Sequence, residues 1–488
     1  MEKYFEKYRA NTIGSNLKMH TPYGEKKVVY ADWIASGRLY LPIEKKIQEV
    51  FGPWVANTHT ETSETGTLMT KSYHWAHQII KNHVNANQND ILITNGNGMT
   101  SVVNKFQRII GMKSCGEITR GRCIQKEKVK PVVFITHMEH HSNHTSWLET
   151  NADVVVLEPN ADLTVNPDEL RKQLEKYKDR NVKIGSFTSC SNVTGVRTDY
   201  HLLAKIMHQN NGLCFIDFAA NAPYEDINMH PNDPEENLDA IFFSPHKFLG
   251  GPGSSGVLLF HKKLYANKTP DHPGGGTVDW TNPWGEYKYI DNIEAREDGG
   301  TPGFLQSIRI ALAIKLKESI GVDNIAKREK QLVEKAFELL SFIPKLHILS
   351  ENIKDRLGVI SFYIDDIHYN LVVKLLNDRF GLQVRGGCAC AGTYGHYLMG
   401  ITPEISRKIS AKISTGDLSS KPGWVRLSLH PTMTDIELEF TANALKEISE
   451  NIHVWEKDYI YNSTNNEFKH KNEIEDKITI IKDWFEFS

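Results

Sequence analysis

The residues best suited to chemistry in this 488-residue chain surround Lys247. The lysine ends the run Ser244-Pro245-His246-Lys247, which follows an apolar stretch and precedes the glycine-rich residues 250–256. At the mouth of a buried sheet a lysine amine is desolvated, which lowers its pKa and makes it a nucleophile able to form Schiff bases. A lone strand-end lysine usually extends into solvent. The Ser-x-His-Lys and glycine-rich context favours the catalytic interpretation here.

Two further segments could complete a cofactor site. Asp217 ends the apolar run 213–216, and a carboxylate at the carboxyl end of a strand points into the ligand crevice of an open α/β sheet. An aspartate there could equally form a turn or cap a helix. Residues 95–100 (Asn-Gly-Asn-Gly-Met-Thr) lie between a predicted strand and a predicted helix, where backbone N–H groups bind anions. A nucleophilic lysine, a carboxylate and an anion-binding turn together suit pyridoxal phosphate (PLP), because a carboxylate keeps its ring nitrogen protonated.

The histidine-rich segment Glu139–His144 follows another apolar run. An imidazole at that position could stack on a cofactor ring. His140 and His144 are also spaced i, i+4, so a metal-dependent hydrolase is a rival hypothesis. The chain has no His-Glu-x-x-His motif and no separate cluster of ligands, so we expect no metal.

The elements that must position these residues alternate along the chain. Asn166 before Pro167 is typical of a helix start, and residues 200–209 have apolar side chains at helical spacing. Seven continuous apolar runs between such helices are typical of strands covered on both faces: residues 90–94, 132–136, 154–157, 184–187, 213–216, 240–243 and 257–260. This alternation predicts an α/β fold with a mostly parallel sheet.

The pattern changes after a long helical stretch over residues 305–342. Residues 359–363 and 425–429 are predicted to be half-buried strands, and Thr434-Asp435-Ile436-Glu437 is a capping box that begins another helix. These elements predict a smaller α+β domain. The polar residues 112–130 are expected to form an exposed loop. The expected division is an N-terminal segment packing with the small domain, a PLP-binding large domain, the small domain and a C-terminal extension, over residues 1–38, 39–308, 309–454 and 455–488.

Composition excludes several classes of function. The formal net charge of -3 gives no reason to expect a nucleic-acid partner or an anionic membrane surface. No apolar run has membrane-spanning length, and the first residues do not resemble a signal peptide. The six cysteines are sparse and lack disulfide-scaffold spacing, which favours a reducing cytoplasm.

Together these motifs resemble the class V aminotransferase superfamily of fold-type-I PLP enzymes, in particular its cysteine desulfurase and selenocysteine lyase branch. The resemblance runs from residues 30–37 to the helix after Thr434, and the Ser-x-His-Lys element is its most specific part. It implies a large domain with a mostly parallel sheet, a smaller α+β C-terminal domain and PLP as the cofactor.

The resemblance also implies a role for each matching residue. Lys247 resembles the Schiff-base lysine, Asp217 the partner of the pyridinium nitrogen, and His140 the stacking imidazole. Arg426 resembles the arginine that clamps the substrate carboxylate, a bidentate task suited to guanidinium. The loop before Thr277 resembles one that reaches a neighbouring subunit's phosphate, which implies a homodimer. The other positions that match cofactor or substrate contacts are Ala35, Gly98, Met99, Thr100, Asn192, Ser244 and His246.

The segment Val384–Ala391 resembles the one that holds the catalytic cysteine. Counting from Arg385, Cys390 falls on the sulfur-accepting position and Cys388 lies two residues before it. If the segment is extended, side chains two residues apart share a face, so either thiol could reach the site. A thiolate near cations would be reactive, although a buried structural cysteine is common.

The chain departs from the family pattern in two places. Ala220 stands where the family usually has a glutamine that contacts the cofactor oxygen. The segment between Cys390 and Arg426 is longer than in many members. These departures leave the cofactor interpretation intact and the specific reaction open.

The function expected from the resemblance is removal of sulfur or selenium from a small amino acid to give alanine, with Cys390 attacking the substrate sulfur and a sulfur-acceptor protein as an implied partner. Another aminotransferase, lyase or epimerase of the superfamily is the alternative within PLP chemistry. The hydrolase using His140 and His144 is the alternative from another class. A non-catalytic PLP-fold protein is a third, against which the retention of Lys247, Asp217 and Arg426 argues.

Overall fold

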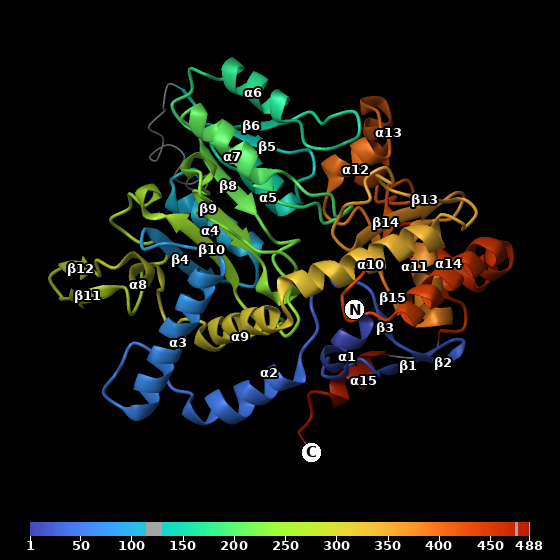
Figure 1. The fold of residues 1–488 in the computed structure, drawn as a ribbon, viewed down its shortest axis with the longest axis horizontal. Helices are drawn as coiled ribbons and strands as arrows, with labels where there is room; N and C mark the ends of the chain where they lie inside the picture. Colours follow the sequence, from blue (N-terminus) through green and yellow to red (C-terminus); the bar gives the residue numbers. More distant parts are fainter. Residues whose placement is uncertain (114–128, 474–476, 488) are drawn as a thin grey trace.

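The computed structural model describes residues 1–113, 129–473 and 477–487. At its centre is a seven-stranded sheet in the order β4-β10-β9-β8-β7-β5-β6 (Figure 1). Its strands are β4 (Asp90–Asn95), β5 (Val132–Ile135), β6 (Asp153–Val156), β7 (Lys183–Thr188), β8 (Leu213–Asp217), β9 (Ala240–Phe243) and β10 (Gly256–His261). β10 is antiparallel to both of its neighbours, and β9, β8, β7, β5 and β6 pair in parallel. The α/β class with a mostly parallel sheet is therefore confirmed.

Helices cover both faces of this sheet. Alternate residues of one strand enter two different apolar clusters: Phe134 packs with Leu203 of α7, whereas Val133 packs with Val102 and Phe106 of α4. This period of two is the signature of a strand buried on both sides. β6, at the sheet edge, is only half-buried. The helices are α3 (Glu64–His83), α4 (Met99–Ile109), α5 (His141–Leu148), α6 (Pro167–Lys176), α7 (Tyr200–Gln209), α8 (Ile293–Glu297) and α9 (Phe304–Ile320).

A second unit follows α9 and lies to the right in Figure 1. Its four-stranded sheet has the order β13-β14-β17-β16, formed by β13 (Leu346–Ile348), β14 (Val359–Ile364), β17 (Trp424–Ser428) and β16 (Arg385–Gly387). Its helices are α10 (Val322–Leu340), α11 (Tyr369–Leu375), α12 (Gly392–Leu398), α13 (Pro403–Ser414) and α14 (Asp435–Trp455). The capping box at Thr434 is present.

The structure refines one expectation about this unit and contradicts another. The helical stretch over residues 305–342 is two helices, because Gly321 adopts a φ of 82° that ends α9 and begins α10. β17 is wholly buried, since α14 and α11 cover its sheet, and β14 is nearly so. Residues 114–128 of the predicted loop lie outside the described residues.

The N-terminal segment contacts both units. It comprises α1 (Glu2–Ala10), the hairpin β1 (Lys18–Thr21) and β2 (Gly24–Lys27), and β3 (Val29–Tyr30). β3 pairs with β15 (Leu382–Gln383) of the second unit, and Val29 joins that unit's core, while Phe5 and Trp33 join the core of the large sheet. Short helical residues 41–54, which include α2 (Leu41–Lys45), lead from it to α3. We propose the domain boundaries given above as the units that fold around these two cores.

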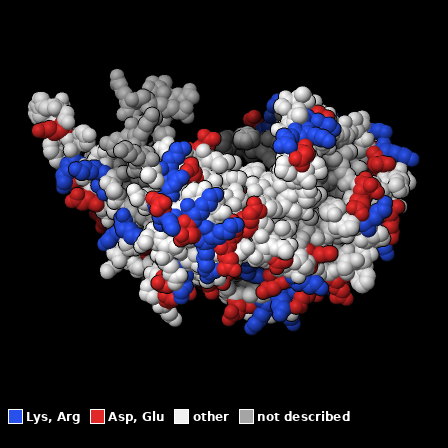
Figure 2. Space-filling view, turned by 90° about the horizontal axis from the view of Figure 1, so that it is seen from above, with Lys and Arg blue, Asp and Glu red and all other residues white. Residues whose placement is uncertain are grey.

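The C-terminal residues form the hairpin β18 (Tyr459–Asn462) and β19 (Glu467–His470), then α15 (Lys477–Asp483). A further hairpin, β11 (Val278–Thr281) and β12 (Tyr287–Tyr289), extends from the large unit at the left of Figure 1. On the face seen in Figure 2, basic and acidic side chains are interspersed. None of the described helices combines the length and the apolar character needed to cross a membrane.

Candidate active site

One pocket of about 330 Å³ gathers most of the predicted site residues. It lies where loops at the carboxyl ends of β5, β7, β8 and β9 meet β16 and β17 of the second unit. This edge is where ligands bind in open α/β sheets. The predicted residues that line the pocket are Ala35, Gly98, Met99, Thr100, His140, Asn192, Asp217, Ser244, His246, Lys247, Cys390 and Arg426. Cys388 and Thr277 do not line it.

One end of the pocket is built to hold an anion. The first turn of α4 begins after Gly98, and Met99 N donates to Ser244 Oγ over 2.9 Å. A Cβ on Gly98 would lie 3.1 Å from that hydroxyl and 3.6 Å from the His246 ring, so only glycine keeps this space open. A helix N-terminus beside a hydroxyl and an imidazole suits a phosphate group.

Asp217 is buried and Lys247 is half-buried, and both line the same pocket. Burial is the main cause that lowers the pKa of Lys247 to about 8, with Asp217 opposing it and Arg426 and Arg385 assisting it. Burial likewise raises the pKa of Asp217 to about 6, although the Ala219 backbone N–H, 2.8 Å away, and Lys247 favour the carboxylate. The lysine amine is therefore more nucleophilic near neutral pH than an ordinary one, as Schiff-base chemistry requires.

His140 presents a neutral imidazole to the pocket. Its Nδ1 accepts the backbone N–H of Ser142 over 3.1 Å and so caps α5. Burial, and then the nearby charge of Lys247, lowers its pKa to about 3. An uncharged ring fixed in this way can stack on a planar cofactor without carrying a charge into the site.

Arg426 forms an ion pair with Asp32, a residue that the sequence analysis did not single out. Its Nη2 donates to Asp32 Oδ1 over 2.9 Å and its Nη1 to the Asn192 carbonyl over 3.2 Å. Arg385 Nε donates to the other oxygen, Asp32 Oδ2, over 3.0 Å. The buried Nε of Arg426 has no hydrogen-bond partner among the described residues, so the guanidinium keeps donor capacity for a carboxylate.

Cys390 reaches the pocket through a tight turn. Ala389 and Cys390 have φ values of 49° and 57°, a left-handed conformation that costs residues with a Cβ roughly 1–2 kcal/mol each. Two hydrogen bonds from the large unit hold the turn: His141 N donates to the Cys390 carbonyl over 2.7 Å, and Asn192 Nδ2 to the Ala389 carbonyl over 2.8 Å. The exposed thiol is thus placed by residues that follow β5 and β7.

The same turn separates the two cysteines. The expectation that Cys388 and Cys390 share a face required an extended segment and is wrong, because the chain turns at residues 389–390. Cys388 packs half-buried against the cluster that contains Tyr394 and Trp424. Thr277 is also outside the pocket, buried in its own loop, where its hydroxyl donates to the Gly274 carbonyl over 2.6 Å.

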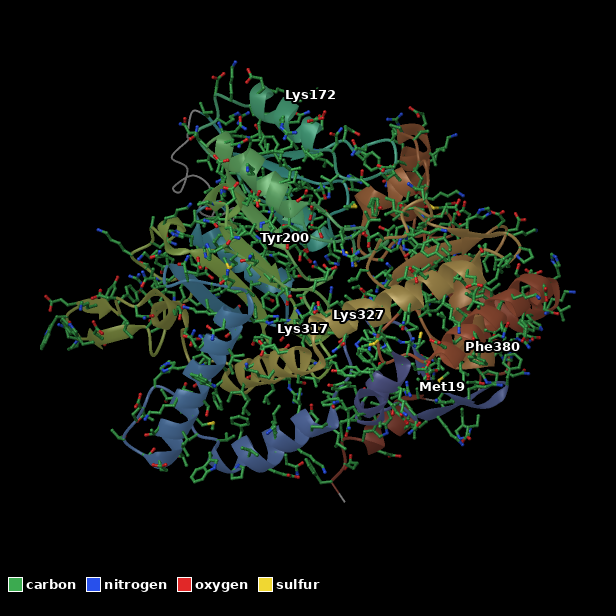
Figure 3. All side chains as sticks on the ribbon, in the orientation of Figure 1. Met19, Lys172, Tyr200, Lys317, Lys327 and Phe380 are labelled. Atoms are coloured by element: carbon green, nitrogen blue, oxygen red, sulfur yellow. The ribbon has the colours of Figure 1, made fainter. Side chains whose placement is uncertain are left out.

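Lys317 is a buried lysine with a structural role. Burial lowers the pKa of Lys317, labelled near the junction of α9 and α10 in Figure 3, to about 8 as well. Its ammonium donates to the Ala222 carbonyl over 2.8 Å and to the Glu225 carbonyl. It therefore joins α9 to the loop after β8, whereas Lys247 opens onto the pocket.

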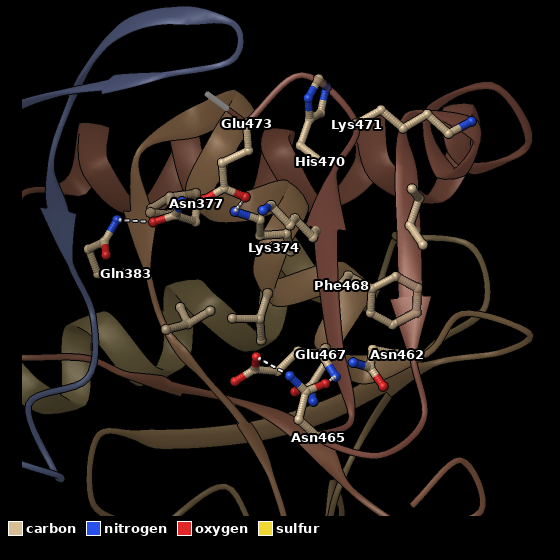
Figure 4. Close-up of a pocket in the computed structure, with 16 residues that line it drawn as sticks. Lys374, Asn377, Gln383, Asn462, Asn465, Glu467, Phe468, His470, Lys471 and Glu473 are labelled. Atoms are coloured by element: carbon tan, nitrogen blue, oxygen red, sulfur yellow. Dashed lines mark hydrogen bonds and ion pairs between the residues drawn. The ribbon is translucent and has the colours of Figure 1, made fainter. Parts of the chain in front are cut away.

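Other cavities lack such a combination of residues. His144 lines a separate cavity with His141 and His396, so His140 and His144 do not face one ligand. In the described ranges, no three histidine, cysteine or acidic side chains are placed to hold a metal ion. A cavity of about 950 Å³ under the C-terminal hairpin contains the ion pair between Lys374 and Glu473 and many amides (Figure 4).

The two groups that sequence reasoning left aside are Asp32 and Arg385. Asp32 lies within residues 30–37, where the family resemblance begins, and Arg385 lies five residues before Cys390. Strands β16 and β17 place Arg385 directly opposite Arg426. Two like charges at opposed positions are destabilising unless an acid lies between them, so the need for Asp32 becomes visible only once the pairing of β16 with β17 is known.

The sequence and the fold were then compared with known proteins. Residues 29–440 match the model of the family described as Aminotransferase class-V. The chain is similar to a probable cysteine desulfurase of Halalkalibacterium halodurans, with 27% identity over 372 residues, which is 75% of this chain and 84% of that protein. A probable cysteine desulfurase of Staphylococcus aureus strain Mu50 is 28% identical over 371 residues, with the same two shares.

Solved structures share the fold. The apo structure of a cysteine desulfurase from Thermococcus onnurineus NA1 superposes with a TM-score of 0.72 at 21% identity, covering 91% of this chain and 98% of that one. The cysteine desulfurase CsdA from Escherichia coli gives a TM-score of 0.69 at 20% identity with the same coverage. These likenesses confirm the fold-type-I architecture expected from the sequence.

Proposed function

The chain belongs to the class V aminotransferase family, and on that premise we propose that it is a PLP-dependent cysteine desulfurase that also accepts selenocysteine. The observation that carries this proposal is that an exposed thiol, Cys390, lines the same pocket as Lys247, Asp217 and Arg426. An aminotransferase needs the last three residues but no thiol. The similarity to probable cysteine desulfurases supports the same choice.

The residues present fit PLP. The Gly98 cradle with Ser244, His246 and the first turn of α4 would hold the phosphate, since a Cβ at residue 98 would fill it. Asp217 would pair with the ring nitrogen, His140 would stack on the ring, and Lys247 would hold the aldehyde carbon. When bound, the cofactor supplies an electron sink for electrons released at the substrate α-carbon.

The chain's own side chains would bind the substrate, transfer protons and attack the sulfur. Arg426 would bind the substrate carboxylate, which orients the side-chain sulfur towards Cys390. The Lys247 amine, with its pKa lowered to about 8, can take and return a proton near neutral pH. The Cys390 thiolate attacks the substrate sulfur, the carbon–sulfur bond breaks, and that carbon gains a proton. Cysteine and the enzyme thiol thus become alanine and an enzyme persulfide.

The test is to incubate the purified holoprotein with L-cysteine or L-selenocysteine and to measure alanine together with sulfide or selenide. We expect alanine from both substrates, and one equivalent of sulfide or selenide per alanine when a reductant is present. A keto acid formed without alanine would instead identify an aminotransferase. The persulfide needs an acceptor, so we also propose that a thiol-bearing protein receives the sulfur. We further propose that the enzyme is a cytoplasmic homodimer.

A further inference from the structure

Three charged side chains meet at the side of the pocket that faces Cys390. Asp32 follows β3, Arg385 begins β16, and Arg426 lies in the middle of β17. The two arginines are direct cross-strand partners. The Asp32 carboxylate bridges them, with one oxygen 2.9 Å from Arg426 Nη2 and the other 3.0 Å from Arg385 Nε.

The three side chains differ in how far they are exposed to a ligand in the pocket. Both arginines line the pocket and Asp32 does not, so the acid lies behind the two cations. Arg426 has a side-chain exposure of 4% and Asp32 of 14%, whereas Arg385 is 52% exposed. A ligand therefore meets two guanidinium groups that share one counter-charge, which sums to a single positive charge.

The other charged side chains that line this pocket are Lys247 and Asp217. Lys247 and Asp217 belong to the part where the cofactor ring would bind, and they offset each other. The imidazoles of His140 and His246 are neutral because burial lowers their pKa values to about 3 and about 4. The summed charge of Asp32, Arg385 and Arg426 thus determines how many anionic groups of a substrate this site can bind.

Resting on the proposed function, we propose that Asp32 is a specificity-determining residue that neutralises Arg385 and so restricts the site to amino acids with one carboxylate and an uncharged side chain. Arg426 takes the α-carboxylate. The substrate side chain points to Cys390, on the segment that Arg385 begins, so a side-chain carboxylate or sulfinate would meet Arg385. In the wild type, Arg385 is already paired with Asp32, and the Asp32 carboxylate repels the second anionic group of such a substrate.

The test measures binding to the holoprotein rather than turnover. Isothermal titration calorimetry would give dissociation constants for L-aspartate and L-alanine, which differ by one side-chain carboxylate. In Asp32→Asn the affinity for L-aspartate relative to L-alanine should rise on the order of tenfold at low salt, and the gain should shrink as salt is added. An unchanged ratio in a folded Asp32→Asn variant would overturn the proposal.

Three further variants make the test specific. Asp32→Asn combined with Arg385→Gln should lose the gain, because the freed cation is then absent; a gain that survives would show that Asp32 acts by another route. Asp153 is a matched control, since it also lies between two cations, Arg180 and Lys130, but far from the pocket. Asp153→Asn should leave the affinity for L-aspartate relative to L-alanine unchanged. Asp32→Glu keeps the carboxylate and should give the wild-type ratio. Failure of the wild type to make alanine from L-cysteine would refute the desulfurase proposal without altering these binding ratios.

Discussion

Cys390 and Lys247 line one pocket although they belong to different folding units. The lysine follows β9 of the large sheet, and the cysteine follows β16 of the small one. Two hydrogen bonds, from His141 N and Asn192 Nδ2, hold the cysteine turn against the large unit. The geometry therefore brings a nucleophilic thiol to the amine that would hold a cofactor.

The first prediction concerns the lysine itself. The holoprotein should be yellow, and Lys247→Ala should lose the visible absorption band, because Lys247 is the only lysine among the described residues that line the pocket. Lys317→Ala is the control, since Lys317 has an equally low pKa but joins α9 to a loop; its folded fraction should keep the band. A wild type that stays colourless with added PLP and contains stoichiometric zinc would favour a metal enzyme.

The second prediction is a pH dependence. Only the deprotonated amine reacts with an aldehyde, and the pKa of Lys247 is lowered to about 8. The rate at which apoprotein takes up PLP should rise with pH up to about 8 and then level off. Stopped-flow absorbance over pH 6.5 to 10 would measure it. A rate that keeps rising towards pH 10 would mean that the amine titrates as an ordinary exposed lysine.

The third prediction concerns Asp217. Asp217→Asn should retain some bound PLP but lose turnover, since the charge that keeps the ring nitrogen protonated is gone. One preorganised electrostatic group contributes on the order of 3 kcal/mol, so kcat should fall by roughly 100-fold or more. Near-wild-type turnover in a folded variant would mean that another residue holds the ring nitrogen.

The fourth prediction is a homodimer with shared sites. The loop before Thr277 lies outside this chain's own pocket, and its resemblance to a cross-subunit phosphate loop gives it a role in the partner. Sedimentation should show a dimer at assay concentration, and mixing inactive Lys247→Ala with an inactive Thr277→Ala variant should restore some activity. An active monomer would contradict this.

Several features were predictable from sequence because they depend on local patterns. Buried parallel strands are continuous apolar runs, so all seven strands of the large sheet were found within a few residues. Twelve of the fourteen predicted site residues line one pocket, because strand ends converge at one edge of the sheet.

What sequence could not show depends on contacts between distant segments. The left-handed turn at Ala389 and Cys390 has no glycine at those positions and is held by donors that follow β5 and β7. The bridge from Asp32 to Arg385 and Arg426 joins the residues after β3 to strands β16 and β17. Neither arrangement has a local signal in any one segment.

The measurement that tests the central claim most directly is alanine production from L-cysteine by Cys390→Ala, Cys388→Ala and the double variant, each loaded with PLP. Cys390→Ala should abolish sulfur transfer and keep the cofactor, because its thiol lines the pocket. Cys388→Ala should reduce activity by a few-fold at most, since Cys388 packs against the cluster with Tyr394 and Trp424. Undiminished alanine production by the double variant would contradict the proposed attack by Cys390 and favour another PLP-dependent reaction.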